Sequence, residues 1–189
     1  HQLVSPAAQA VISYDPASGK ELWKVLHRGW SLAPRPIFGH GMAYVIMDHD
    51  RPELWAIRPD GKGDVTESHI AWKQKRGMPS RSSPLLVGDL VFVVNHDGIA
   101  TCLDAKTGSM IWKNRLKGDY SASLLQARGR IYFFNEDSTC TIVRAARKYE
   151  ILGTNSLDGE RLMASPAAAG NSLYVRTEGH LYRIEKSPR

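Results

Sequence analysis

The sequence predicts an all-β protein, a β-propeller built of four-stranded antiparallel blades. Two observations carry this prediction. Three sets of residues recur along the chain with one common spacing, and each repeated unit holds four short runs of β-branched and aromatic residues separated by turns. A repeat of about 40 to 50 residues with four short strands is typical of a propeller blade and not of a helical repeat.

The repeat is marked by three kinds of residue. Aromatic residues in Gly-led apolar runs are spaced by 48, 41 and 41 residues, at Tyr44, Phe92, Phe133 and Tyr174. Tryptophans that follow an Asp/Gly turn are spaced by 49 and 40 residues, at Trp23, Trp72 and Trp112, and a further 40 residues reaches Leu152. Serines that mostly precede proline lie at Ser83, Ser123 and Ser165. Independent markers with one period indicate a true internal repeat.

The third unit shows the strands most clearly. It contains the runs SSPLLV, DLVFVVN, GIATCLD and SMIWKNR, separated by VGD, HDG and AKTG. Gly and Asp at these turns supply the positive φ that tight hairpins need. The second run is almost wholly apolar, which predicts a strand buried on both faces between neighbouring blades.

The whole chain, 1–189, is therefore expected to be a single propeller segment of about four blades. In chain order we expect a blade part at 10–25, whole blades at 30–75, 80–115 and 120–153, and a partial blade at 162–186. Three arrangements are open. The ELWKV strand at 21–25 could complete the last blade of the same chain, the chain could be the C-terminal half of a seven- or eight-bladed ring, or two chains could associate as half-rings. Self-association is favoured, because an unclosed propeller exposes sheet edges and an apolar blade face.

The repeat tryptophans are expected to lie between blades. An indole there buries about 150–250 Å² and still offers its N–H to a backbone carbonyl. Trp23, Trp72 and Trp112 are therefore predicted to be structural. Trp30 and Trp55 lie outside the repeat register and are freer to serve a surface.

Composition excludes several classes of protein. The chain has 42% hydrophobic and 23% charged residues, as a globular protein has, and no apolar run long enough to span a membrane. The first residues lack the basic start and apolar core of a signal peptide, so the N-terminus does not reveal the compartment. The net charge of +6 favours anionic partners, but the basic residues are scattered, so specific nucleic-acid binding is not expected. Cys102 and Cys140 have no metal-ligand spacing and are expected to be buried hydrophobes, with a disulfide between them as the alternative.

The unit Ser-Pro, Gly, Tyr/Phe, then Leu-Asp-x-x-Thr-Gly-x-x-x-Trp resembles the pyrroloquinoline-quinone-like (PQQ-like) repeat. The resemblance covers nearly the whole chain and is strongest at 10–23 and 82–112. Such repeats occur in quinoprotein alcohol dehydrogenases, in the propeller lipoprotein of the bacterial outer-membrane β-barrel assembly machinery, and in PQQ-like proteins of planctomycetes. The resemblance implies a propeller and a periplasmic or otherwise extracytoplasmic location.

The enzyme branch of that family is not supported by the residues. Quinoprotein dehydrogenases carry a vicinal Cys-Cys pair, whereas Cys102 and Cys140 are 38 residues apart. No residue matches the family's calcium ligands or its catalytic Asp. Asp48-His49-Asp50 occupies the same hairpin position as Asn95-His96-Asp97 and is interpreted as a turn. We therefore expect no catalytic, cofactor-binding or metal-ligating residues.

The predicted function is a non-catalytic scaffold that binds a protein or an anionic polymer; the alternative is a fragment or subunit of a quinoprotein oxidoreductase. Propeller function usually resides on the loops around the channel mouth. The segments before each first strand are expected to line that mouth, and their candidate binding residues are Arg35, Arg81 and Tyr120. The long insertion RPDGKGDVTES at 58–68 is a further candidate for partner contact, with a mobile surface loop as the alternative.

Overall fold

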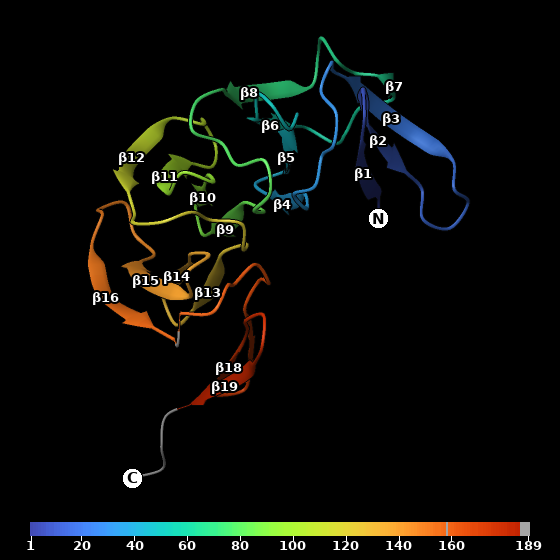
Figure 1. Ribbon diagram of the computed structural model, residues 1–189. Coiled ribbons are helices and arrows are strands. Elements are labelled where there is room, and N and C mark those ends of the chain that lie inside the picture. The colour runs from blue at the N-terminus through green and yellow to red at the C-terminus, as the bar shows by residue number, and fades with distance from the viewer. Residues whose placement is uncertain (158, 186–189) are drawn as a thin grey trace.

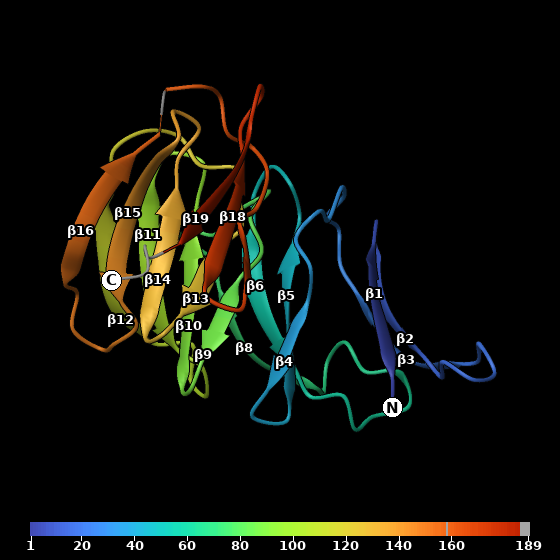
Figure 2. The same ribbon diagram turned by 90° about the horizontal axis from the view of Figure 1, so that it is seen from below.

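The chain folds into an open arc of β-sheets (Figure 1). The structure is a computed structural model that describes residues 1–157 and 159–185, and the described residues form strands and no helix. Five sheets follow one another around the arc, with their short inner strands toward its centre (Figure 1). Seen from below, the sheets stand side by side like the blades of a propeller (Figure 2). The predicted all-β propeller is confirmed.

Three of the sheets are complete antiparallel blades, with strands spanning 37–74, 85–115 and 125–156, so the last one extends past the bound expected at 153. In each, consecutive strands pair with their neighbours, so the order in the sheet is the order in the chain. The second sheet contains β4 (Ile37–Gly39), β5 (Met42–Met47), β6 (Glu53–Ile57) and β8 (Ile70–Gln74). The third contains β9 (Leu85–Val87), β10 (Leu90–Val94), β11 (Ile99–Asp104) and β12 (Met110–Arg115). The fourth contains β13 (Leu125–Ala127), β14 (Arg130–Phe134), β15 (Thr139–Arg144) and β16 (Ile151–Ser156).

The two terminal sheets differ from these blades. The first contains β1 (Leu3–Ala7), β2 (Ala10–Tyr14) and β3 (Glu21–Leu26), so it begins before the blade part expected at 10–25 and has one strand more. The fifth contains β17 (Ala167–Ala169), β18 (Ser172–Arg176) and β19 (Leu181–Glu185). Residue 186, the last of the predicted partial blade, lies outside the described residues. Among those described, β3 pairs with β2 and β7 and not with β19, so the chain does not close on itself.

The insertion at 58–68 completes the first sheet. Its strand β7 (Gly63–Asp64) pairs in parallel with β3, with Trp23 opposite Gly63. Val65 is 2% exposed, its N–H donates to Lys24 O at 2.9 Å, and the Thr66 hydroxyl accepts the Leu26 N–H at 2.8 Å. The segment predicted as a partner-binding or mobile loop therefore extends from the second blade and forms the edge strand of the first sheet.

The apolar cores lie in the seams, the interfaces between neighbouring sheets. Strand β10 shows why its sequence does not alternate. Val91 and Val93 belong to the cluster shared with the second sheet, whereas Phe92 and Val94 belong to the cluster shared with the fourth. All four side chains are fully buried. A strand packed on both faces needs apolar residues at every position.

The structure has two loop-bearing faces. One of them carries the linkers between blades and, in each blade, the hairpin between the second and third strands. We call it the hairpin face. Backbone hydrogen bonds join the two kinds of loop there. Tyr120 N donates to His96 O at 2.8 Å and Leu162 N donates to Glu136 O at 2.9 Å, so each linker is fixed to the hairpin of the preceding blade. No described segment is a helix long and apolar enough to cross a membrane.

Candidate functional site

Two of the repeat tryptophans join their own blade to the next one. Trp72 Nε1 donates to Ala105 O at 3.1 Å, and Trp112 Nε1 donates to Ala146 O at 3.1 Å. Both acceptors lie just after the third strand of the following blade. The Trp112 ring also packs on Tyr149 of the next sheet, with centroids 5.1 Å apart. The structure thus places these indoles in the seams, where each N–H satisfies a backbone carbonyl.

Trp23 makes the same connection through a relay. It is fully buried, and its Nε1 donates to Gln2 Oε1 at 2.9 Å. Gln2 Nε2 then donates to Pro59 O at 3.0 Å, a carbonyl that follows the third strand of the second blade. An amide side chain both donates and accepts, so Gln2 extends the reach of the indole.

The fourth blade lacks this tryptophan. Each blade has a register shift between its third and fourth strands, which places Trp72 opposite Ala56 and Trp112 opposite Cys102. In the fourth blade the equivalent residue, opposite Ile142, is Gly153 and not the Leu152 expected from spacing. No atom lies within 4 Å of the place where a Cβ on Gly153 would lie. The spacing missed by one residue because the turn between the third and fourth strands is one residue longer in the fourth blade: Leu103 pairs with Met110, whereas Val143 pairs with Ile151.

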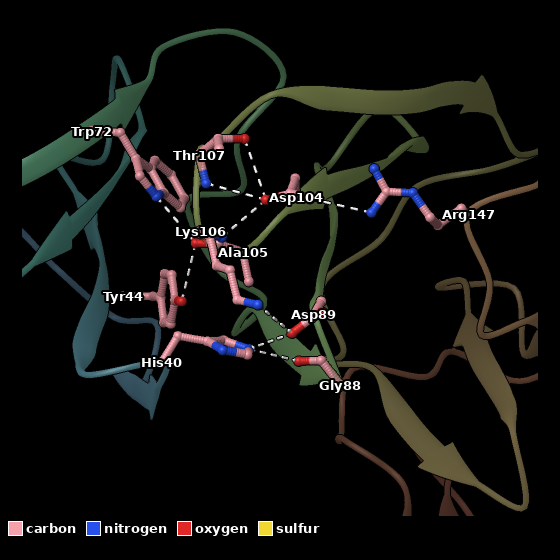
Figure 3. A network of polar contacts seen from close by, with 10 residues as sticks. All are labelled: His40, Tyr44, Trp72, Gly88, Asp89, Asp104, Ala105, Lys106, Thr107 and Arg147. Carbon is pink, nitrogen blue, oxygen red and sulfur yellow. Dashed lines mark hydrogen bonds and ion pairs between the residues drawn. The ribbon is translucent and has the colours of Figure 1, made fainter.

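A polar network surrounds the Trp72 seam (Figure 3). The Ala105 carbonyl accepts both Trp72 Nε1 and the Tyr44 hydroxyl, each at 3.1 Å. Burial raises the pKa of Tyr44 to about 12, which keeps this hydroxyl a donor. On the next seam, Arg147 Nη1 donates to Asp104 Oδ2 at 3.1 Å and is the main cause of a lowered pKa for that carboxyl.

In the same view, an imidazole of the second blade and a lysine of the third lie beside one carboxylate at the seam between these blades (Figure 3). His40 Nε2 lies 3.4 Å and Lys106 Nζ lies 3.4 Å from Asp89 Oδ1. His40 Nε2 is also 2.9 Å from Gly88 O. These polar groups hold neighbouring blades together.

A chain of serines links the inner strands. Arg35 N donates to Ser83 Oγ at 2.9 Å, Ser83 N donates to Ser123 Oγ at 3.0 Å, and Ser123 N donates to Ser165 Oγ at 3.0 Å. The serine marker of the repeat is thus an acceptor for the backbone of the preceding blade. Buried backbone N–H groups need such partners.

Charged side chains of three blades gather around Glu136 on the hairpin face. The Ser121 hydroxyl donates to its Oε1, Arg161 Nη2 lies 3.3 Å from Oε2, and Arg81 Nη1 and His96 Nδ1 each lie 3.9 Å from Oε1. The Ser121 hydroxyl, then Arg161, holds the pKa of Glu136 below its ordinary value. The Glu136 side chain is 15% exposed, whereas those of Arg81 and Arg161 are 46% and 60% exposed. This cluster presents two oriented guanidinium groups to solvent around a partly buried carboxylate.

The three residues predicted at the channel mouth do not form one site. Arg81 belongs to the Glu136 cluster. Arg35 is exposed and lines a separate hollow with Pro36 and Phe38 near the N-terminus. Tyr120 is 2% exposed and packs in the core between the third and fourth sheets, so the prediction that it reads a ligand is corrected. Its linker turns the ring inward because the backbone N–H is fixed to His96 O.

Sequence reasoning missed Glu136 and Arg161 as members of a site. Glu136 lies in the hairpin between β14 and β15, and Arg161 lies in the linker between the fourth and fifth sheets. The one available signal is that Glu136 is an acidic residue at the hairpin position where the third blade has His96. That difference becomes meaningful only when the curvature of the arc brings the two hairpins together.

Comparison with known proteins identifies the lineage. A family model described as "Outer membrane protein assembly factor BamB" matches residues 2–188 of the chain. The chain belongs to this family. The membership confirms the resemblance to PQQ-like repeats.

Individual relatives agree with this BamB-family assignment. The "Outer membrane protein assembly factor BamB" of Burkholderia pseudomallei (strain K96243) is 29% identical over 122 residues, which cover 59% of this chain and 29% of that protein. The crystal structure of BamB from Moraxella catarrhalis superposes with a TM-score of 0.72 and 15% identity, covering 97% of this chain and 54% of that one. The chain thus spans under a third of the curated relative and about half of the solved one.

Two further structures show the fold alone. The computationally designed Ika8 protein matches with a TM-score of 0.71 at 11% identity, over 96% of this chain and 57% of that one. A europium-containing methanol dehydrogenase matches with a TM-score of 0.54 at 13% identity, over 66% of this chain and 24% of the enzyme. At such identities the shared architecture carries no shared chemistry.

The cysteines of this BamB-family chain are core residues. Cys102 and Cys140 are buried and free, and burial raises the pKa of each thiol to about 12. A buried thiol with so high a pKa stays protonated at neutral pH. Across residues 1–157 and 159–185, no group of three or more His, Cys, Asp or Glu side chains is placed to hold a metal ion.

Proposed function

We propose that this chain is part of a non-catalytic propeller scaffold that works outside the cytoplasm and binds a protein partner through its hairpin face. The relatives are named as outer membrane protein assembly factors, so the proposed partner is a protein of outer-membrane assembly. The observation that carries the proposal is the Glu136 cluster, in which two half-exposed arginines from different blades are held on the loop-bearing face.

The geometry of the cluster suits recognition of an acidic protein surface. Arginine is enriched at protein interfaces because its planar donors match carboxylates. Glu136 orients Arg81 and Arg161 before binding, so less side-chain entropy is lost when a partner carboxylate arrives. The net charge of +6 adds long-range attraction to an acidic partner.

Charge reversal in the full-length natural protein tests the proposal. A photo-activatable cross-linker at Asp137, an exposed residue next to Glu136 that makes none of the contacts described for the cluster, should yield a discrete adduct with an envelope protein. The double substitution Arg81→Glu and Arg161→Glu should abolish that adduct. The matched control is Arg130→Glu, an exposed arginine at the start of β14, which should leave it unchanged. An adduct insensitive to charge reversal would remove the cluster from the interface.

The quinoprotein alternative predicts a different result. A fragment or subunit of such an enzyme would reduce an artificial electron acceptor when supplied with an alcohol, the quinone and Ca²⁺. The likeness to methanol dehydrogenase supports only the fold, so we expect no quinone-dependent reduction by the natural protein. Reduction that depends on both quinone and metal would overturn the scaffold proposal.

Association of two chains as half-rings is a second element of the proposed function. The open arc leaves the edges of the first and fifth sheets free among the described residues, and such edges favour pairing (Figure 1). Light scattering on the purified 189-residue chain should give twice its mass of 21.0 kDa. A monomer that persists as the concentration rises would contradict the association.

A further inference from the structure

We propose that the hairpin face carries a saccharide-binding site, formed by the exposed Trp30 and the polar hollow between the hairpins of the second and third blades. Trp30 is 51% exposed, and its Nε1 donates to Asp50 Oδ2 at 3.1 Å. Its ring also lies against His49, with centroids 5.4 Å apart and planes inclined by 47°. An indole held from two sides offers a rigid aromatic platform to solvent.

Exposure of Trp30 is specific to this blade. The linker Arg28-Gly29-Trp30 corresponds to Arg76-Gly77-Met78 in the next repeat, 48 residues later. A proline lies six residues after Trp30 and six residues after Met78, which supports this alignment. Met78 is 2% exposed and belongs to the core between the second and third sheets. The same repeat position therefore points inward in one blade and outward in the other.

The backbone around Trp30 is built to hold it outward. Ser31 has φ of 51° and Asp48 has φ of 69°, both in the left-handed region that non-glycine residues rarely adopt. Gly29 lies so close to the hairpin that a Cβ there would meet the Asp48 backbone at 2.8 Å. Strained conformations of this kind persist where the surrounding structure imposes them, and they gather at binding sites. The linker and the hairpin are thus locked together under the indole.

A hollow of about 520 Å³ is lined in part by His49 and Asp50, the two residues that contact Trp30. His49 and Asp50 form one wall, and the hairpin of the third blade, with Asn95 and His96, forms another. The ionisable groups along it nearly cancel, since two cations, Arg51 and Lys75, face three carboxylates. His49 Nδ1 is buried and has no hydrogen-bond partner among the described residues.

This combination favours a neutral polyhydroxylated ligand over a protein side chain. Protein hot spots insert into apolar, fully desolvated pockets, and this hollow would force charged groups out of water without apolar gain. Hydroxyl groups both donate and accept, so a sugar can pair with the alternating amide, imidazole and carboxylate groups and keep bridging waters. The less polar face of a sugar ring can then cover the exposed indole. The balanced charge excludes selection for a strongly anionic ligand.

A soluble neutral oligosaccharide tests the proposal on the full-length natural protein. The tetramer of N-acetylglucosamine serves as probe, with titration calorimetry and saturation-transfer NMR as readouts. Trp30→Ala should weaken binding by about tenfold or more, a change easily resolved from the titration. Trp30→Phe should restore part of the affinity. If both variants keep the melting temperature of the natural protein, the weaker binding is due to loss of the indole and not to unfolding.

Matched controls locate the site. Phe38→Ala removes another exposed aromatic residue, 67% exposed at the N-terminal hollow, and should leave oligosaccharide binding unchanged. The Arg81→Glu, Arg161→Glu protein should also bind the oligosaccharide normally, so the test stands apart from the proposed protein interface. Absence of binding by the natural protein at millimolar probe would overturn the proposal, as would equal binding by Trp30→Ala. Loss of the protein cross-link in Trp30→Ala, without oligosaccharide binding, would assign Trp30 to the protein interface instead.

Discussion

Two neighbouring seams of this molecule are built on the same repeat and differ in cohesion. Between the third and fourth sheets, Trp112 packs with Phe92, Tyr120 and Phe133 in one buried cluster and donates to a carbonyl of the next blade. Between the fourth and fifth sheets, the tryptophan position is Gly153, and the buried cluster is formed by smaller or fewer side chains.

The surface shows the consequence. Ile151 and Leu152, the two residues before Gly153, are 51% and 37% exposed, and Ile184 on the facing sheet is 40% exposed. The backbone pairing of β15 with β16 follows the same register shift as β11 with β12, so the blade itself is unchanged. Strand pairing therefore stabilises the blade itself, whereas one large side chain on its outer strand stabilises the packing of that blade against the next one.

The largest expected effect is that of Trp112→Ala. Truncation of a buried tryptophan costs about 3–5 kcal/mol of unfolding free energy, a large share of a typical total of about 5–15 kcal/mol. Denaturant unfolding followed by circular dichroism measures it. Leu152→Ala, on the outer strand of the fourth blade, is the control and should cost under about 1 kcal/mol because its side chain is 37% exposed. Equal costs for the two substitutions would contradict the difference between the seams.

The serine chain provides a second test of the comparison. Ser123→Ala removes the acceptor of Ser83 N at the stronger seam. This hydrogen bond is partly buried, so its loss should cost about 1 kcal/mol, the lower end of the cost of a buried N–H without a partner. Ser165→Ala removes the equivalent acceptor of Ser123 N at the weaker seam. Ser165 is exposed, so water can replace it and the cost should be smaller. Thermal unfolding of the two variants compares them, and the reverse order would show that seam burial does not govern this bond.

Gly153→Ala should stabilise the weaker seam. Glycine inside a regular element is unfavourable by roughly 0.5–1 kcal/mol relative to alanine because its unfolded chain has more freedom. Gly153 does not have a positive φ, and no atom within 4 Å obstructs a Cβ. Chemical denaturation should show a gain of that order. Gly98→Ala is the contrasting control: its φ is 77° and a Cβ would meet Leu116 O at 2.6 Å, so it should destabilise.

The smallest expected effect concerns pH. Glu136 joins both seams through Arg81 and Arg161, and its folded pKa is below its ordinary value of 4.5. A lowered carboxyl pKa contributes stability above the unfolded pKa, and that contribution disappears as pH falls through the folded pKa. Glu136→Gln should therefore be less stable than the natural chain at pH 7, and the two should converge at strongly acidic pH. A difference that stays constant down to acidic pH would show that the charge of Glu136 has no part in it.

Much of the fold was predictable because periodicity is local information. The aromatic, tryptophan and serine markers predicted the three complete blades, and the family comparison confirms the propeller. Local information also explains the failures. In the sequence, Tyr120 has the features of a loop residue with a polar hydroxyl. In the structure it is buried in the core, because its linker is hydrogen-bonded to the hairpin of the preceding blade. Trp55, expected to be free for a surface, is 8% exposed, with its Nε1 bound by Glu53.

The sequence by itself determined the blade: four short strands, their turns and a large residue on the outer strand, all set by contacts within about 40 residues. Only the tertiary structure decided how blades meet. It placed Gly153 opposite Ile142 and joined β7 to a strand some 40 residues earlier. It also gathered Arg81, Glu136 and Arg161 from three blades. These outcomes depend on the curvature of the arc, because the side chains that meet there are separated along the chain by whole repeats.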